Sequence, residues 1–376
     1  MQVKDKIVTW FIKNVVTPRR EIIDRPGFIV TTFTENKRTT YLREILLPER
    51  LFELMENKIV ECYGDEGKQT LYSAGKKFVY LYSSISNFPN IKDTSTKELS
   101  DFAYYLLRYI ETMFAQQANH ELDFEKRILS IEFKNYIICR NNGLGYIMMD
   151  GALAGLWAYE LQDRTIEGIQ LECQGRGDQQ CKILCAPGKE LFEKYHLTLK
   201  EHDLPEIKYD NFYRVINEIR PAAYSNKSLK LLINAGFFKY HEGNLSYQNS
   251  RFFICESHIL YFLEEEIKKL PNGEQFLYQI CFDYGVQLHE INGQDNFRLF
   301  IQDFFTGLGF GDIHVDTKDL SITFRYYPWS IFSEKSSDVI MRVIISGFVS
   351  SCLKKKIEFH KVEVNVGQYL KITIRE

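Results

Sequence analysis

The chain has 376 residues, of which 45% are hydrophobic and 26% are charged, and its net charge is −3. This composition excludes a disordered chain and gives enough length for two globular domains. The nearly balanced charge provides no electrostatic footprint for direct nucleic-acid binding. We expect a cytoplasmic protein, because no apolar run could span a bilayer, no signal-peptide core opens the chain and eight cysteines are too few for a disulfide scaffold.

The first half of the chain alternates between helical and strand-like periodicity. Stretches with an apolar residue every three or four positions predict helices, and short alternating stretches between turn residues predict strands. In chain order, we expect helix 3–16, strands 27–33 and 39–42, helices 48–64, 67–83 and 95–118, strand 128–139, helix 147–162, and strands 166–173 and 181–186. This order predicts an N-terminal helix within residues 1–26 and a first domain over residues 27–190.

The second half repeats this order of elements after a charged linker helix over residues 191–222. Its clearest match is 320–325 (LSITFR), which reproduces the pattern of 129–134 (LSIEFK). A helix and two closing strands follow in the same order, over 339–354, 361–366 and 369–374. We therefore predict two tandem domains of α/β (α+β) class, each an antiparallel sheet packed against several helices, with a second, degenerate copy over residues 223–376.

The most specific local pattern is the hairpin over residues 167–183, in which a glycine-rich turn separates two cysteines. If the turn brings Cys173 opposite Cys181, two sulfurs meet on the buried face, which suits zinc with further ligands from elsewhere. Cys185 lies on the same face further along the strand and is the third candidate ligand. Buried core cysteines and a redox or disulfide pair are the alternative interpretations.

This hairpin resembles that of the 4-vinyl reductase domain family, with Glu167 and Gly168 before the cysteines and a tyrosine-bearing helix upstream. The resemblance covers the order of elements over 27–187 and is sharp over 167–183. It implies an α/β sensor domain of the kind that binds aromatic hydrocarbons or phenols. It also implies a fold like that of the small subunits of the TRAPP trafficking complex.

Metal-binding members of this family imply a particular ligand set for zinc. Two hairpin cysteines at this spacing bind the metal together with a glutamate three positions before the first and a cysteine on the preceding helix. Cys173 and Cys181 match this pattern. The glutamate position is occupied by Gln170, the expected helix over 147–162 contains no cysteine, and Asp150 is the nearby carboxylate.

The resemblance further implies an apolar cavity between helices and sheet, lined by aromatic side chains. The candidate ligand-binding residues are rings near the predicted cavity: Tyr104, Tyr105, Tyr146, Trp157 and Tyr159. Rings at helical spacing are also typical of an ordinary core, so a structural role is the alternative for each of them.

Three functions are compatible with these patterns. The first is a non-enzymatic sensor or regulatory module for a small apolar or aromatic ligand, the second a TRAPP-like protein adaptor, and the third an accessory factor in tetrapyrrole reduction. No catalytic set can be assembled from local spacing, and no cofactor motif is visible. A sensor would need a separate protein effector. Because related single domains pair as homodimers, we expect an internal pseudo-dimer of the two copies or a homodimer.

Overall fold

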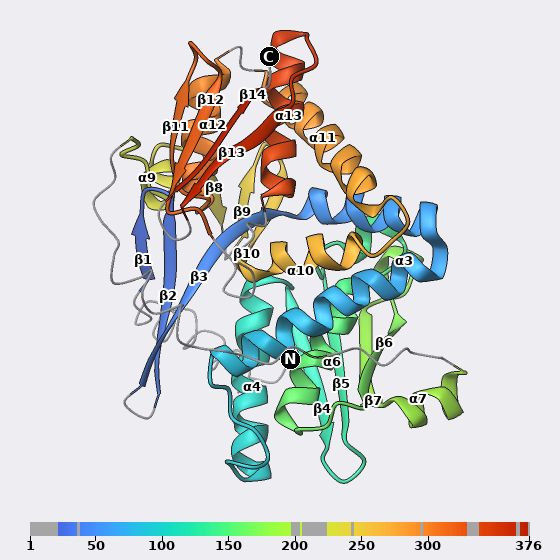
Figure 1. Ribbon diagram of the computed structural model, residues 1–376. Coiled ribbons are helices and arrows are strands. Elements are labelled where there is room, and N and C mark those ends of the chain that lie inside the picture. The colour runs from blue at the N-terminus through green and yellow to red at the C-terminus, as the bar shows by residue number, and fades with distance from the viewer. Residues whose placement is uncertain are drawn as a thin grey trace. The chain divides into compact units, whose positions relative to one another are not determined.

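The computed structural model describes residues 22–35, 38–196, 204, 224–241, 244–293, 296–328, 338–365 and 369–374. It is a mixed α/β structure of antiparallel sheets packed against helices, which confirms the predicted fold class (Figure 1). The described residues divide into two compact units: those within 33–40 and 56–207 belong to unit 1, and those within 22–32, 41–55 and 208–376 belong to unit 2. The N-terminal helix expected over 3–16 and most of the linker lie outside the described residues. None of the described helices combines the length and apolar character that crossing a bilayer requires.

Unit 1 contains a four-stranded antiparallel sheet with the strand order β4-β5-β7-β6. Its elements are the later part of α3 (Glu49–Ile85), α4 (Thr96–Met113), β4 (Gln117–Asp123), β5 (Ile128–Lys134), α5 (Cys139–Asn142), α6 (Ile147–Glu160), β6 (Ile166–Glu172), the 3-10 turn η2 (Gln174–Arg176), β7 (Cys181–Pro187) and α7 (Gly188–Tyr195). Helix α3 is kinked at Gly64, where the first of two separate helices was expected to end, and Ser95 and Glu98 form a capping box at the start of α4. Helix α6 packs on β6 and β7.

Two expected boundaries in unit 1 are wrong. The helix expected to run to residue 118 ends at Met113, and the polar segment 117–123 forms strand β4, in antiparallel register with β5. The strand expected over 128–139 ends at Lys134, before the short helix α5. The segment of β4 is mostly polar, and the strand derives its stability from pairing with β5.

Helices α3 and α6 lie unusually close together. A Cβ atom on Gly151 would sit 2.0 Å from the carbonyl oxygen of Tyr72, and one on Gly155 would sit 2.3 Å from that of Lys76. The absence of side chains at these two positions is what permits this approach. These two glycines therefore serve helix-to-helix packing, which holds α6 against α3.

A buried polar network ties α3 to strand β6. The Lys76 ammonium lies 2.7 Å from Glu167 Oε1, and the Tyr72 hydroxyl donates to Glu167 Oε2 at 2.6 Å. The same hydroxyl accepts from the amide of Gly168 at 2.8 Å. Because the lysine and the carboxylate are both buried, each neutralises a charge that the interior could not otherwise hold.

Unit 2 contains a six-stranded sheet of order β1-β2-β3-β10-β9-β8 and a four-stranded sheet of order β11-β12-β14-β13. Its elements are β1 (Ile22–Arg25), β2 (Phe28–Glu35), β3 (Arg38–Pro48), α9 (Leu229–Asn234), β8 (Lys239–His241), β9 (Asn244–Tyr247), β10 (Ser250–Glu256), α10 (His258–Ile267), α11 (Gly273–Asn292), α12 (Phe297–Gly307), β11 (Asp312–Asp316), β12 (Ser321–Arg325), α13 (Val339–Leu353), β13 (Phe359–Asn365) and β14 (Tyr369–Ile374). Helices α11 and α13 lie side by side (Figure 1).

The strands over residues 22–32 and 41–48 belong to unit 2, although the expected first domain spanned residues 27–190. Strand β3 pairs in antiparallel register with β10. The buried Arg43 guanidinium donates to the carbonyl oxygens of Gly27, Gly309 and Tyr326, each at 2.7 Å. Neither long-range pairing nor a side chain that joins three distant backbone segments leaves a local pattern in the sequence.

The four-stranded sheets of the two units share one topology, in which a hairpin, a helix and a second hairpin follow one another. In each unit a buried glutamate from another helix also contacts the start of the helix between the two hairpins, α6 or α13. Glu56 Oε1 accepts from the amide of Met148 in α6, and Glu264 Oε1 accepts from that of Ile340 in α13, both at 3.1 Å. Burial raises the pKa of each carboxyl to about 8. The duplication of the sequence itself stays a prediction.

Candidate metal centre

The turn of the β6–β7 hairpin is organised around the backbone of Cys173. The Cys173 amide donates to Asp178 Oδ2 at 2.7 Å, and its carbonyl oxygen accepts from the amides of Arg176 and Asp178. A Cβ atom on Gly175 would lie 1.8 Å from the carbonyl oxygen of Cys139. The glycine of the turn therefore allows the hairpin to approach the start of α5 directly.

Cys139 begins α5 immediately after a strained residue. Ile138 has a φ of 65°, which is rare for a β-branched side chain, and the amide of Ile137 donates to the carbonyl of Phe114. Such strained residues concentrate at functional sites, where the surrounding structure holds them in place. This bend takes the chain out of the β4–β5 sheet and turns Cys139 towards the hairpin.

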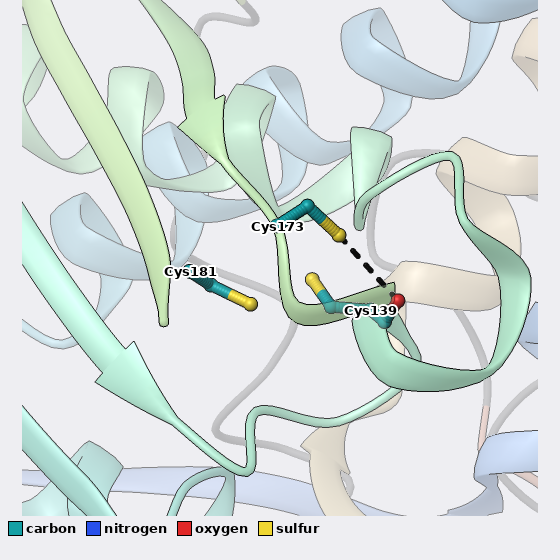
Figure 2. Close-up of side chains that lie close together, drawn as sticks. All are labelled: Cys139, Cys173 and Cys181. Carbon is teal, nitrogen blue, oxygen red and sulfur yellow. Dashed lines mark hydrogen bonds between the residues drawn. The ribbon is translucent and has the colours of Figure 1, made fainter. Parts of the chain in front are cut away.

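Three cysteine sulfurs converge at this point. The Sγ atoms of Cys139, Cys173 and Cys181 all lie within 4.8 Å of one another, and all three residues are fully buried. Figure 2 shows them side by side, with the Cys173 thiol donating to the carbonyl oxygen of Cys139 at 3.5 Å. The hairpin pair Cys173 and Cys181 thus meets as expected, and its third neighbour comes from α5.

Cys185, the third cysteine expected from the sequence, is not part of this cluster. It pairs with Gly168 and Leu129, four residues along β7 from Cys181, which corresponds to about 13 Å of strand. Burial raises its pKa, and its charged neighbours include Asp150 and Glu167. Sharing a strand face does not bring it close enough to share a metal.

The pKa values of the three clustered thiols are displaced in opposite directions. Hydrogen bonding with Cys139 lowers the pKa of Cys173 to about 6 and lowers that of Cys181. The same interactions, together with burial, raise the pKa of Cys139. A lowered pKa favours the thiolate, the form in which cysteine binds metal.

Gln170 stands where the resemblance implies a glutamate, and its side chain reaches the cluster. Its Oε1 accepts from the amide of Tyr146 at 3.0 Å, and its Nε2 donates to the sulfur of Cys139 at 3.2 Å. The side chain contributes a hydrogen bond to the thiol group and presents its amide nitrogen, which has no lone pair available for a metal.

Two buried carboxylates lie near the sulfurs. Glu56 accepts from Met148 N with Oε1 and from Asn142 Nδ2 with Oε2. Asp150, in the first turn of α6, has a buried Oδ1 without a hydrogen-bond partner, and burial raises its pKa well above the usual range. Its charge also interacts with those of Cys173 and Cys181.

Three aromatic rings lie near Asp150 and the cysteine cluster. Tyr136 is fully buried, stacks on Phe133 with ring centroids 4.3 Å apart, and lies 6.0 Å from Tyr146. The Tyr136 hydroxyl has no hydrogen-bond partner, and burial raises its pKa. The negative charge of Asp150 contributes to this shift, which places both unpartnered groups in one neighbourhood.

The five rings singled out in the sequence do not gather around this neighbourhood. Tyr146 lies beside it, whereas Trp157 is about 16 Å further along α6 and donates to the carbonyl of Arg127. Tyr159 donates to the carbonyl of Phe88, from a different face of α6. Tyr104 and Tyr105 contact each other on α4, and Tyr105 is exposed. Their assignment to one ligand site stays a prediction.

Sequence reasoning missed Cys139, Tyr136 and Glu56. Cys139 was assigned to the end of a strand, although Asn141, Asn142 and Gly143 directly after it are typical turn residues and signal a change of structure. Tyr136 stands in the same misassigned segment. Glu56 lies on a predicted helix far from the hairpin, and no local pattern marks it.

Unit 2 has no cysteine at the position equivalent to Cys181. In unit 1 Cys181 pairs with Phe133, and in unit 2 Leu370 pairs with Phe324. The order of the closing strands in the two halves places Val366 opposite Cys173, and Val366 lies outside the described residues. Unit 2 instead contains a cluster of aromatic rings whose contacting centroids are 4.6 to 6.3 Å apart: Phe237, Phe238, Tyr247, Phe252, Phe300, Phe304 and Phe348.

The chain is similar to the solved structure of a sensory domain. That domain is the phenol-responsive sensory domain of the transcription activator PoxR, in complex with phenol. The similarity has a TM-score of 0.36 and 14% sequence identity, and it covers 54% of this chain and 100% of that domain. No protein-family model and no curated protein matches the sequence.

Proposed function

We propose that unit 1 is a non-enzymatic sensor or regulatory module that binds a small apolar, ring-bearing molecule with one polar group. The observation that carries this proposal is the pair of unpartnered polar atoms, the Tyr136 hydroxyl and Asp150 Oδ1, buried beside Phe133 and Tyr146. A buried polar atom without a partner costs about 1–3 kcal/mol. A ligand with a ring and a hydroxyl would satisfy both atoms and bury its ring among theirs.

We further propose that Cys139, Cys173 and Cys181 hold a zinc ion. Their buried sulfurs fit this metal, because thiolates are preferred zinc ligands and these three lie within 4.8 Å of one another. The metal would act as a Lewis-acid cross-link between the hairpin and α5. Since α5 directly precedes Tyr146 and α6, the cysteines would also hold the segment that carries Asp150 in place.

We propose a different role for unit 2, which contains the predicted second copy. Its cluster of aromatic rings and its Leu370 in place of a cysteine suit a structural role or a protein-binding role. Ligand binding would then be confined to unit 1, and the signal would pass to a separate effector protein. A TRAPP-like adaptor is the alternative that this cluster of rings favours.

Calorimetric titration with phenol and toluene tests the ligand proposal. Phenol should bind, and Asp150→Ala should weaken binding by about 2- to 10-fold, because an ordinary buried hydrogen bond contributes about 0.5–1.5 kcal/mol. Toluene lacks the hydroxyl and should bind more weakly than phenol. Tyr278→Phe, which removes a buried hydroxyl from unit 2, is the matched control. Equal binding of phenol to the wild type and to Asp150→Ala would contradict the proposal.

Native mass spectrometry with elemental analysis tests the zinc proposal. The full chain should carry one zinc ion, and serine at position 139, 173 or 181 should remove it. Cys185→Ser is the matched control, because this cysteine is equally buried on the same hairpin and should not affect zinc content. Loss of zinc from Cys185→Ser, with retention in Cys139→Ser, would contradict the assignment.

A further inference from the structure

We infer that a metal held by Cys139, Cys173 and Cys181 keeps a fourth coordination position open to an exogenous neutral donor. The inference rests on the proposed zinc centre. Protein zinc is almost always four-coordinate, and sites that keep one position for water or a ligand have three protein ligands. Among the described residues, the ligand atoms that come together here are these three sulfurs. The centre thus has the donor count of a ligand-binding site and one donor fewer than a closed structural site.

Gln170 does not supply the fourth donor, and the reason lies in its backbone partner. The amide of Tyr146 is a fixed donor, so the oxygen of the Gln170 side chain has to face it, as observed at 3.0 Å. The nitrogen is then the atom that faces Cys139 Sγ, at 3.2 Å. Reversing the side-chain amide of Gln170 would place its Nε2 donor against the N–H donor of Tyr146. The orientation that Tyr146 imposes therefore keeps the oxygen away from the sulfurs.

The nearby carboxylates do not complete the ligand set either. Both oxygens of Glu56 already accept hydrogen bonds, from Met148 N and Asn142 Nδ2. Asp150 has a free, buried Oδ1 but does not belong to the group of ligand atoms within 4.8 Å of one another. From its position in the first turn of α6 it can instead accept a hydrogen bond from whatever molecule occupies the open position.

Charge selects the class of that molecule. Three thiolates and a divalent metal already carry a net charge of −1 in this buried site. An anionic donor would add a second buried negative charge, at high cost in a low-dielectric environment. A small neutral ring with one lone-pair atom for the metal and one N–H or O–H for Asp150 satisfies both demands. An azole has this pair of groups.

Cobalt(II) loading of the full chain tests the inference, with imidazole as the probe. A thiolate-to-cobalt charge-transfer band reports whether the cysteines bind metal at all, and the visible d–d bands report the fourth donor. Imidazole should shift the d–d bands in a saturable manner. 1-Methylimidazole lacks the N–H, and it should bind about tenfold more weakly to the wild type.

Two variants separate the outcomes. Gln170→Glu supplies an anionic oxygen towards the sulfurs and should keep the charge-transfer band while losing the response to imidazole. Asp150→Asn should keep the charge-transfer band and bind imidazole more weakly. Absence of the charge-transfer band in the wild type would overturn the zinc centre and this inference together. A charge-transfer band without an imidazole response would overturn the inference alone, and a response that appears only in Asp150→Asn would identify Asp150 as the fourth ligand.

Discussion

Glu160, at the C-terminal end of α6, should make unit 1 less stable as the pH rises. Its side chain is buried, with 1% of the residue exposed, and its Oε1 has no hydrogen-bond partner. Burial raises its pKa from 4.5 to about 8. The folded state therefore holds a proton on this carboxyl at pH values where the unfolded chain has already lost it.

The sign and size of the effect follow from proton linkage. Between the two pKa values the folded state binds one more proton than the unfolded state, so the free energy of unfolding falls by about 1.4 kcal/mol per pH unit. From about pH 5 to about pH 7.5 this amounts to roughly 3 kcal/mol. Glu160→Gln keeps the shape and removes the titration, so its stability relative to wild type should rise by this amount over the interval.

Urea unfolding of the wild type and Glu160→Gln at several pH values measures this difference, with circular dichroism as the signal. Glu98→Gln is a control of opposite sign, because hydrogen bonds from Ser95 lower the pKa of Glu98 at the cap of α4. Compared with the wild type, Glu98→Gln should be less stable at neutral pH than it is in acid. A stability difference between Glu160→Gln and wild type that does not change with pH would refute the reasoning.

Two further predictions concern the packing of α3. Lys76→Met leaves the buried Glu167 carboxylate without its cation and should lower the free energy of unfolding by about 3–5 kcal/mol. The double variant Lys76→Met/Glu167→Gln should recover part of this loss. A Lys76→Met variant as stable as the wild type would contradict the prediction. Gly151→Ala places a methyl group 2.0 Å from the carbonyl oxygen of Tyr72 and should cost about 1–3 kcal/mol or more, measured by thermal unfolding. Gly188→Ala, whose nearest contact is a side-chain atom at 3.2 Å, should cost less, and equal losses would argue against close helix packing.

The second half of the chain shows how well local periodicity predicts elements. Helix α13 and strand β14 were expected within one residue of their observed ends, because buried faces impose the 3.6-residue and two-residue periods on the sequence. The polar strand β4 was not predicted, since its pairing with β5 imposes no apolar alternation. The assignment of β3 to unit 2 likewise depends on pairing with β10 and on Arg43, which joins segments hundreds of residues apart.

For the candidate site, the sequence by itself determined the hairpin, the glycine turn and the pairing of Cys173 with Cys181. These are properties of one short segment whose turn residues and strand alternation are local. Only the tertiary structure decided that Cys139 is the third thiol, that Cys185 lies apart, and that Tyr136 and Asp150 share one buried neighbourhood. Side chains from separate segments meet when the chain folds, and no local spacing in the sequence records which of them will meet.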